Sequence, residues 1–153
     1  IIRVGSAGAL NPDIKVRDIV LGQGACTNSA YASQYGLPGT YAPIASYNVL
    51  RTCADIATEM GVPFHVGNLL SSDTFYSDDE NANAGWMKMG VLAVEMEAAG
   101  LYMTAARLKK NALAICTISD SLITGEALPP LERQNSFTQM MEIALRTAVK
   151  LNG

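Results

Sequence analysis

Two acidic residues, Glu95 and Glu97, lie in an apolar setting where a short apolar run meets a helical pattern. Carboxylates are rarely buried unless they are paired or used. In an extended segment the two side chains share one face, whereas in a helix they point to nearly opposite sides. The start of a helix also offers free backbone N–H groups to an anion. We expect one glutamate to be structural and the other to reach a polar ligand; the alternative is two surface glutamates in a first helical turn.

A third acid, Asp120, follows the uninterrupted apolar run 111–118, which is typical of a strand inside a parallel sheet. A carboxyl group in such a position can hold a proton for donation, although a cap or turn is an equally good interpretation. Arg133 lies in the first turn of a helix predicted over residues 131–150. Because a cation is unfavourable at a helix N-terminus, we expect a carboxylate or anion nearby, and Asp120 is the candidate.

A cationic and a hydroxyl side chain, Arg3 and Ser6, flank the start of a glycine-rich stretch. The pattern predicts a strand over residues 1–4 and a turn over residues 5–10. Glycines let backbone N–H groups approach an anion, and the planar guanidinium suits phosphate. The stretch lacks the P-loop lysine and the full dinucleotide pattern, so a plain tight turn is the alternative.

The remaining pattern predicts strands over residues 16–22 and 64–70, a long loop over 24–43, and a helix that Ser46 caps and that runs to Met60. A further helix runs from the glutamate pair to residues 109–110. Phe75 follows the 64–70 strand, at the kind of strand end where open α/β sheets bind ligands, and is a candidate stacking surface or a core residue. The alternation predicts a single α/β domain over residues 1–153, with a mixed, largely parallel central sheet flanked by helices.

The amino-acid composition argues against several classes of function. The 153 residues carry a net charge of -3 without a Lys/Arg cluster, which argues against nucleic-acid binding. We find no signal peptide and no apolar run long enough to span a membrane. Three widely spaced cysteines favour a reduced, cytoplasmic protein. A single histidine, His65, cannot form a metal cluster alone, so we expect no metal.

A resemblance to a known family rests on three stretches that occur in this order and at these separations, residues 2–8, 94–100 and 118–120. Further support comes from residues 66–69, 72–76 and 132–137. The chain resembles the nucleoside phosphorylase superfamily, and within it the bacterial hexameric-type purine nucleoside phosphorylases. The resemblance covers residues 1 to about 150. The chain opens without Met on a strand in progress, which suggests that an upstream segment is missing. Since the family's chain begins well before the position that matches residue 1, the resemblance implies the C-terminal two-thirds of a subunit, lacking the N-terminal third.

The resemblance implies a role for each matching residue. Arg3 and Ser6 match positions that hold phosphate, and Glu97 matches the residue that binds the ribose hydroxyls. Asp120 matches the general acid at purine N7, and Arg133 the arginine that assists this proton transfer. The other positions implied to bind the nucleoside are Met96, Val94, Glu95, Phe75, Ser119, Ala7 and Gly8.

The implied reaction is phosphorolysis of purine nucleosides to a free base and (deoxy)ribose-1-phosphate, with nucleoside and inorganic phosphate as partners and no cofactor. The implied assembly is a homo-oligomer, a hexamer built as a trimer of dimers. Ser121 stands where many close relatives have histidine, which leaves open the choice between 6-oxo and 6-amino purines. The alternatives are a nucleosidase of the same fold, a uridine phosphorylase, or a non-catalytic nucleoside-binding fragment.

The family's N-terminal third supplies further phosphate-binding groups and a histidine lent by the neighbouring subunit. We therefore expect this chain alone to have an incomplete phosphate site and an exposed sheet edge or face. It should be part of a longer subunit or inactive by itself.

Overall fold

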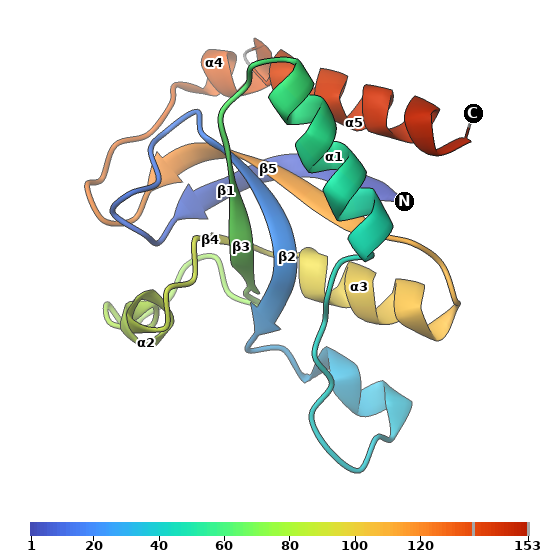
Figure 1. Cartoon of the computed structure of the whole chain (residues 1–153). Helices are drawn as coiled ribbons and strands as arrows, with labels where there is room; N and C mark the ends of the chain where they lie inside the picture. The colour runs from blue at the N-terminus through green and yellow to red at the C-terminus, as the bar shows by residue number, and fades with distance from the viewer. Residues whose placement is uncertain (136, 153) are drawn as a thin grey trace.

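Five strands close into a barrel in the order β1-β4-β3-β2-β5 (Figure 1). The structure is a computed structural model that describes residues 1–135 and 137–152. The pairs β1/β5, β2/β3 and β3/β4 are parallel, whereas β1/β4 and β2/β5 are antiparallel. The predicted mixed, largely parallel sheet flanked by helices is therefore confirmed. The closure of this sheet into a barrel was not predicted from the sequence. The strands are β1 (Ile2–Ala9), β2 (Ile19–Thr27), β3 (Phe64–Ser71), β4 (Ala93–Glu95) and β5 (Leu113–Ser121).

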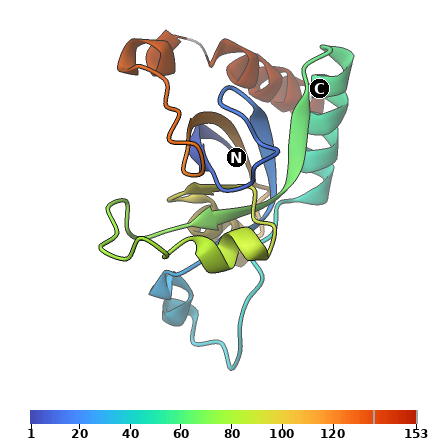
Figure 2. The same ribbon diagram turned by 90° about the vertical axis from the view of Figure 1, so that its left-hand side faces the viewer.

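The helices cover the barrel in two places. Helices α1 and α5 lie side by side (Figures 1 and 2), and their apolar faces pack over strands β2 and β5 in one core cluster. Helix α3 packs over another core cluster, where small residues such as Ala98 and Ala99 let it lie close to the barrel. The helices are the 3₁₀ helix η1 (Ala30–Tyr35), α1 (Tyr47–Glu59), α2 (Ala84–Lys88), α3 (Ala98–Arg107), α4 (Pro130–Asn135) and α5 (Thr138–Asn152).

A buried hydroxyl joins helix α3 to the barrel. The Tyr102 O–H donates to the carbonyl oxygen of Gly22 at 2.5 Å and accepts from the Ala114 N–H at 2.9 Å. Because Gly22 lies in β2 and Ala114 in β5, one side chain satisfies backbone groups of two strands. A Cβ at position 22 would lie 3.0 Å from the Tyr102 oxygen, so glycine suits this close approach.

The predicted glycine-rich turn over residues 5–10 is wrong, because β1 continues through Ala9. Pairing with β5 satisfies the backbone along this stretch, with an irregularity between Ala7 and Gly8. The glycines leave room for side chains instead. A Cβ on Gly5 would lie 2.7 Å from Arg3 Nη1, and a Cβ on Gly8 would lie 3.0 Å from Asp120 Oδ2. The pairing of β1 with β5, a strand far along the chain, explains why the local pattern was misleading.

Other boundaries also differ from the sequence prediction. The strand predicted over 16–22 begins only at Ile19 and continues to Thr27, and the loop predicted over 24–43 contains η1. Ser46 precedes α1, but its hydroxyl accepts from the Ala112 N–H at 3.0 Å instead of capping its own helix. The single helix predicted over 131–150 is two helices, α4 and α5, separated by a stretch that includes Phe137.

Candidate active site

A cavity of about 450 Å³ opens beside β1, β4 and the end of β5. It collects every residue that the sequence predicts for the site except Ala7. Ser6 and Gly8, two residues apart in β1, both line it, whereas Ala7 between them is buried in the barrel core, as alternation along a strand requires. The lining residues are Arg3, Ser6, Gly8, Asn28, Ser72, Thr74, Phe75, Ser77, Ala82, Asn83, Trp86, Val94, Glu95, Met96, Glu97, Ser119, Asp120, Leu122 and Arg133.

An acid and a guanidinium meet at one end of the cavity. Arg133 Nη2 lies 4.0 Å from Asp120 Oδ1, and this oxygen also accepts from the Ser119 hydroxyl at 2.6 Å. The Nε–H of Arg133 donates to the Leu128 carbonyl at 3.0 Å, which fixes the direction of its side chain. The expected proximity of Arg133 and Asp120 is therefore present in the structure.

The reason given for that proximity was wrong. Helix α4 has only six residues, and Arg133 lies in its last turn, where a cation interacts favourably with the helix dipole. Position within a helix therefore does not force Arg133 to seek a carboxylate. The contact with Asp120 follows instead from how the segment before α4 folds back along β5, where the Leu128 N–H donates to the Ser119 carbonyl at 2.8 Å.

The other cation, Arg3, lies among anionic side chains. Its Nη1 lies 3.5 Å from Glu95 Oε2 and donates to Cys116 Sγ at 3.6 Å, and its Nη2 forms an ion pair with Glu97. Burial lowers the pKa of the Arg3 guanidinium, but Cys116, Glu95 and Glu97 raise it, and the net pKa lies above its ordinary value. Arg3 is therefore a permanent positive charge in the lining of the cavity, to which the exposed Ser6 also belongs.

The two glutamates have different surroundings. The carboxylate of Glu95 is buried and accepts from the backbone N–H groups of Glu97 and Ala98 and from the Ser71 hydroxyl. It thereby satisfies free donors at the start of α3. Glu97 instead keeps more than half of its side chain exposed at the cavity. The structure thus agrees with the expectation that one glutamate is structural and that the other can reach a ligand.

An apolar surface lies along the middle of the cavity. Phe75 is 73% exposed and makes an edge-to-face contact with Tyr76 at 4.8 Å between ring centroids, so the alternative of a core role is wrong. Val94 and Met96, on either side of Glu95, also line the cavity. These side chains give a planar, largely apolar group an apolar surface to contact in the same cavity as the acid–guanidinium pair.

Eight of the described lining residues were not predicted as site residues from the sequence, among them Asn28, Ser72 and Trp86. Asn28 follows β2, and it donates to the Ser72 hydroxyl at 3.2 Å and accepts from the Asp73 N–H at 3.0 Å. Its position at a strand end is a signal that could have identified it, and the same is true of Ser72 after β3. Trp86, the one tryptophan in the sequence, lies on α2, where no local pattern marks it.

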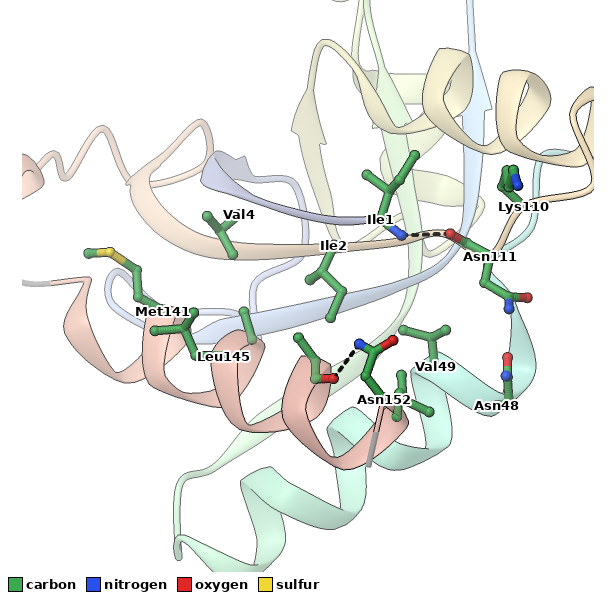
Figure 3. Close-up of a pocket in the computed structure, with 13 residues that line it drawn as sticks. Ile1, Ile2, Val4, Asn48, Val49, Lys110, Asn111, Met141, Leu145 and Asn152 are labelled. Atoms are coloured by element: carbon green, nitrogen blue, oxygen red, sulfur yellow. Dashed lines mark hydrogen bonds between the residues drawn. The ribbon is translucent and has the colours of Figure 1, made fainter.

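A larger groove of about 890 Å³ lies elsewhere, between the start of β1 and α5 (Figure 3). Its wall is mostly apolar, with Ile1, Val4, Met141 and Leu145 on it. Among the described residues of its lining, Lys110 carries the one charged side chain, so this part of the groove lacks the paired acid and cation of the smaller cavity. Most of its lining comes from α1 and α5, with Ile2 and Val4 from β1, so the exposed sheet edge or face expected from the sequence stays a prediction.

No group of three or more metal-ligating side chains occurs within residues 1–135 and 137–152, and no helix among them is long and apolar enough to cross a membrane.

The fold and the site define the class to which the chain belongs. The family model described as the phosphorylase superfamily matches residues 1–151, and the chain belongs to this superfamily. This confirms the family resemblance seen in the sequence.

Particular relatives are similar over nearly the whole chain. The purine nucleoside phosphorylase DeoD-type of Clostridium novyi (strain NT) is 51% identical over 148 residues, which are 97% of this chain and 64% of the relative. That of Caldanaerobacter subterraneus subsp. tengcongensis has the same identity and coverage. A solved structure described as the P knowlesi homolog of P falciparum PNP has a TM-score of 0.82 at 28% identity, over 99% of this chain and 61% of that one. The chain thus spans about 64% of the length of these curated relatives.

Proposed function

We propose that this chain carries out phosphorolysis of purine nucleosides, releasing the purine base and (deoxy)ribose-1-phosphate. The observation that carries the proposal is the cavity that holds the Asp120–Arg133 pair together with Arg3 and Glu97. The names of relatives about 50% identical over nearly the whole chain support the same reaction.

The reaction needs a proton for the leaving group. As an oxygen of phosphate attacks the anomeric carbon, the bond from this carbon to purine N9 breaks and its electron pair passes to the purine. Protonated Asp120 donates to N7, which keeps the departing base neutral. The guanidinium of Arg133 favours the carboxylate that remains, because opposite charges attract strongly where water is scarce. General acid catalysis of this kind contributes about 10²–10⁴-fold.

Arg3 and the exposed Glu97 are proposed to bind the two reacting partners, phosphate and the ribose. Arg3 and Ser6 bind phosphate, and Glu97 binds the ribose hydroxyls while its charge favours the cation-like sugar. Since Arg3 is paired with Glu97 in this structure, incoming phosphate must compete with that carboxylate for the guanidinium. Met96, Val94, Glu95, Ser119 and Gly8 complete the proposed nucleoside site, and Phe75 packs on the base. Ala7, which the resemblance implied for the same site, is buried outside the cavity.

The proposed unit is one α/β domain over residues 1–153 that works in a homo-oligomer, a hexamer built as a trimer of dimers, in the cytoplasm. Three free cysteines support a reducing compartment. A cluster on η1 and α3 suits a subunit contact: the exposed ring of Tyr31 packs edge-to-face on Tyr35, and its hydroxyl lies 2.7 Å from that of Thr104.

The test is product analysis with inosine and phosphate. Ribose-1-phosphate is expected, whereas free ribose would identify a nucleosidase and faster turnover of uridine a uridine phosphorylase. Replacing Asp120 with asparagine should lower kcat about 10²–10⁴-fold. Asp79→Asn, in an exposed loop, is the matched control and should leave kcat unchanged. Full turnover by Asp120→Asn would refute the proposed acid.

One observation favours a second candidate, a nucleoside-binding module without phosphorolysis. Among the residues described, the cation Arg3 is already paired with two carboxylates, Glu95 and Glu97. Calorimetry that shows purine binding without turnover, in the complete assembly, would select this function.

A further inference from the structure

Arg17 adopts a backbone conformation that is unfavourable for its residue type. Its φ is +77°, in the left-handed region, and among the non-glycine residues that the structure describes only Lys109 shares a positive φ. Strain of this kind is retained where the surrounding structure fixes it, often near functional sites. We propose that Arg17 is a positioning residue that sets where Arg133 lies relative to Asp120. The inference rests on the proposed function and adds a residue outside the cavity.

The turn that contains Arg17 is fixed to the strand that carries the acid. The Arg17 N–H donates to the Ile118 carbonyl at 2.8 Å, and the Ile118 N–H donates to the Asp18 carbonyl at 2.9 Å. Asp18 closes the turn by accepting from the Lys15 N–H at 2.8 Å, and its carboxylate lies 3.1 Å from His65 Nε2. Since Ile118 lies two residues before Asp120, Arg17 and the acid share one rigid support.

The side chain of Arg17 reaches the short helix that carries the second catalytic group. Its Nη2 forms an ion pair with Glu132, the residue directly before Arg133. Both Glu132 and Arg133 donate their N–H groups to the Pro129 carbonyl, so they move together. A six-residue helix is marginal on its own and depends on its contacts. Arg17 thus ties α4 to β5 close to the Arg133–Asp120 pair.

The geometry predicts an effect on turnover rather than on stability. Arg17 and Glu132 are 57% and 45% exposed, and ion pairs that exposed add little to folding. The interaction between Arg133 and Asp120 instead depends on their separation, which is 4.0 Å at the closest atoms. A small displacement of α4 therefore changes the proton transfer while the barrel stays folded.

Arg17→Asn tests this directly, because asparagine tolerates the left-handed conformation and only the ion pair is lost. We expect kcat to fall roughly three- to tenfold, as misplacing a catalytic group does, with KM for the nucleoside and the melting temperature unchanged. Arg17→Lys keeps a cation and should recover most of the lost turnover. Lys109→Asn is the matched control, since it removes a cation at a positive φ outside the cavity, and it should change nothing.

A second measurement does not depend on activity. The Nε–H of Arg133, which donates to Leu128, gives an NMR order parameter for the side chain. It should fall in Arg17→Asn and stay unchanged in Lys109→Asn. An unchanged order parameter, an unchanged kcat, or a melting temperature that falls in parallel with kcat would each overturn the role of Arg17. If no variant and no native assembly breaks nucleosides, the proposed function fails, and the order parameter still decides whether Arg17 positions Arg133.

Discussion

The carboxylate of Glu95 accepts the backbone N–H of Ala98 with both oxygens, at 3.0 and 2.9 Å. It also accepts from the Ser71 hydroxyl and lies 3.5 Å from Arg3. Glu95→Ala would leave these buried donors without their acceptor and would remove one of the two carboxylates paired with Arg3, so the free energy of unfolding should fall by about 3 kcal/mol. Urea denaturation measures it. Glu97→Ala is the control, since Glu97 is exposed, and it should cost under about 1 kcal/mol; equal losses would contradict the division of roles.

Tyr102→Phe tests the bridge between β2 and β5. The change removes one hydroxyl and leaves the Gly22 carbonyl and the Ala114 N–H unpaired in the core. We expect a loss of about 1–3 kcal/mol in the free energy of unfolding and faster hydrogen exchange at the Ala114 amide. Tyr47→Phe, on an exposed side chain of α1, should leave both quantities unchanged. Wild-type stability in Tyr102→Phe would show that the hydroxyl is dispensable.

The three thiols should react at very different rates. Cys26 is partly exposed, whereas Cys53 and Cys116 are fully buried, and burial raises the pKa of Cys53 to about 11 and that of Cys116 to about 12. At pH 8 Ellman's reagent should modify one thiol in the native protein and three after unfolding. Cys26→Ser should abolish the native reaction. Rapid modification of a second thiol would mean that the core opens easily.

The same thiols predict a loss of stability in alkali. Because their pKa values are raised above the ordinary value of 9, the folded state keeps protons that the unfolded chain has released. The free energy of unfolding should therefore be constant below about pH 9 and fall as pH rises through 11 and 12. Melting temperatures between pH 8 and pH 11 measure this. In Cys53→Ala/Cys116→Ala the decline should be shallower, and an identical decline would assign it to other groups.

The apolar groove between β1 and α5 should bind the dye ANS in the native state. Leu145 is 68% exposed on its wall, which Ile1 and Val4 also line (Figure 3). Leu145→Lys should lower the native ANS fluorescence, and because the side chain is exposed the stability should change by less than about 0.5 kcal/mol. The matched control Leu131→Lys, on exposed α4 outside the groove, should leave the dye signal intact.

The sequence predicted those features that depend on local pattern. Apolar periodicity placed β3, α1 and β5 within one to three residues, and the glutamate pair marked the junction of β4 and α3. It failed where distant residues decide the structure. Gly5 pairs with Cys116 and Gly8 with Asp120, so this strand depends on a partner strand far along the chain.

Long-range contacts also explain why some parts of the site were not predicted from the sequence. Arg17 and Glu132 are 115 residues apart, so no local spacing predicts their ion pair. Helix α2 is five residues long and carries no buried residue, so it lacks the apolar periodicity that would predict it or the place of Trp86 in the cavity. Barrel closure depends on which strands pair, and strand pairing is not encoded in the period of any one of them.

The parallel pairing of β1 with β5 has a consequence for biosynthesis. Ile2 lies opposite Leu113, and Ala9 lies opposite Ser121. A ribosome must therefore deliver nearly the whole barrel before β1 can meet this neighbour. Until then β1 can pair only with β4, through Gly8 and Ala9. Closing so large a loop is slow, so the nascent chain should depend on chaperones more than a helical bundle of equal length would.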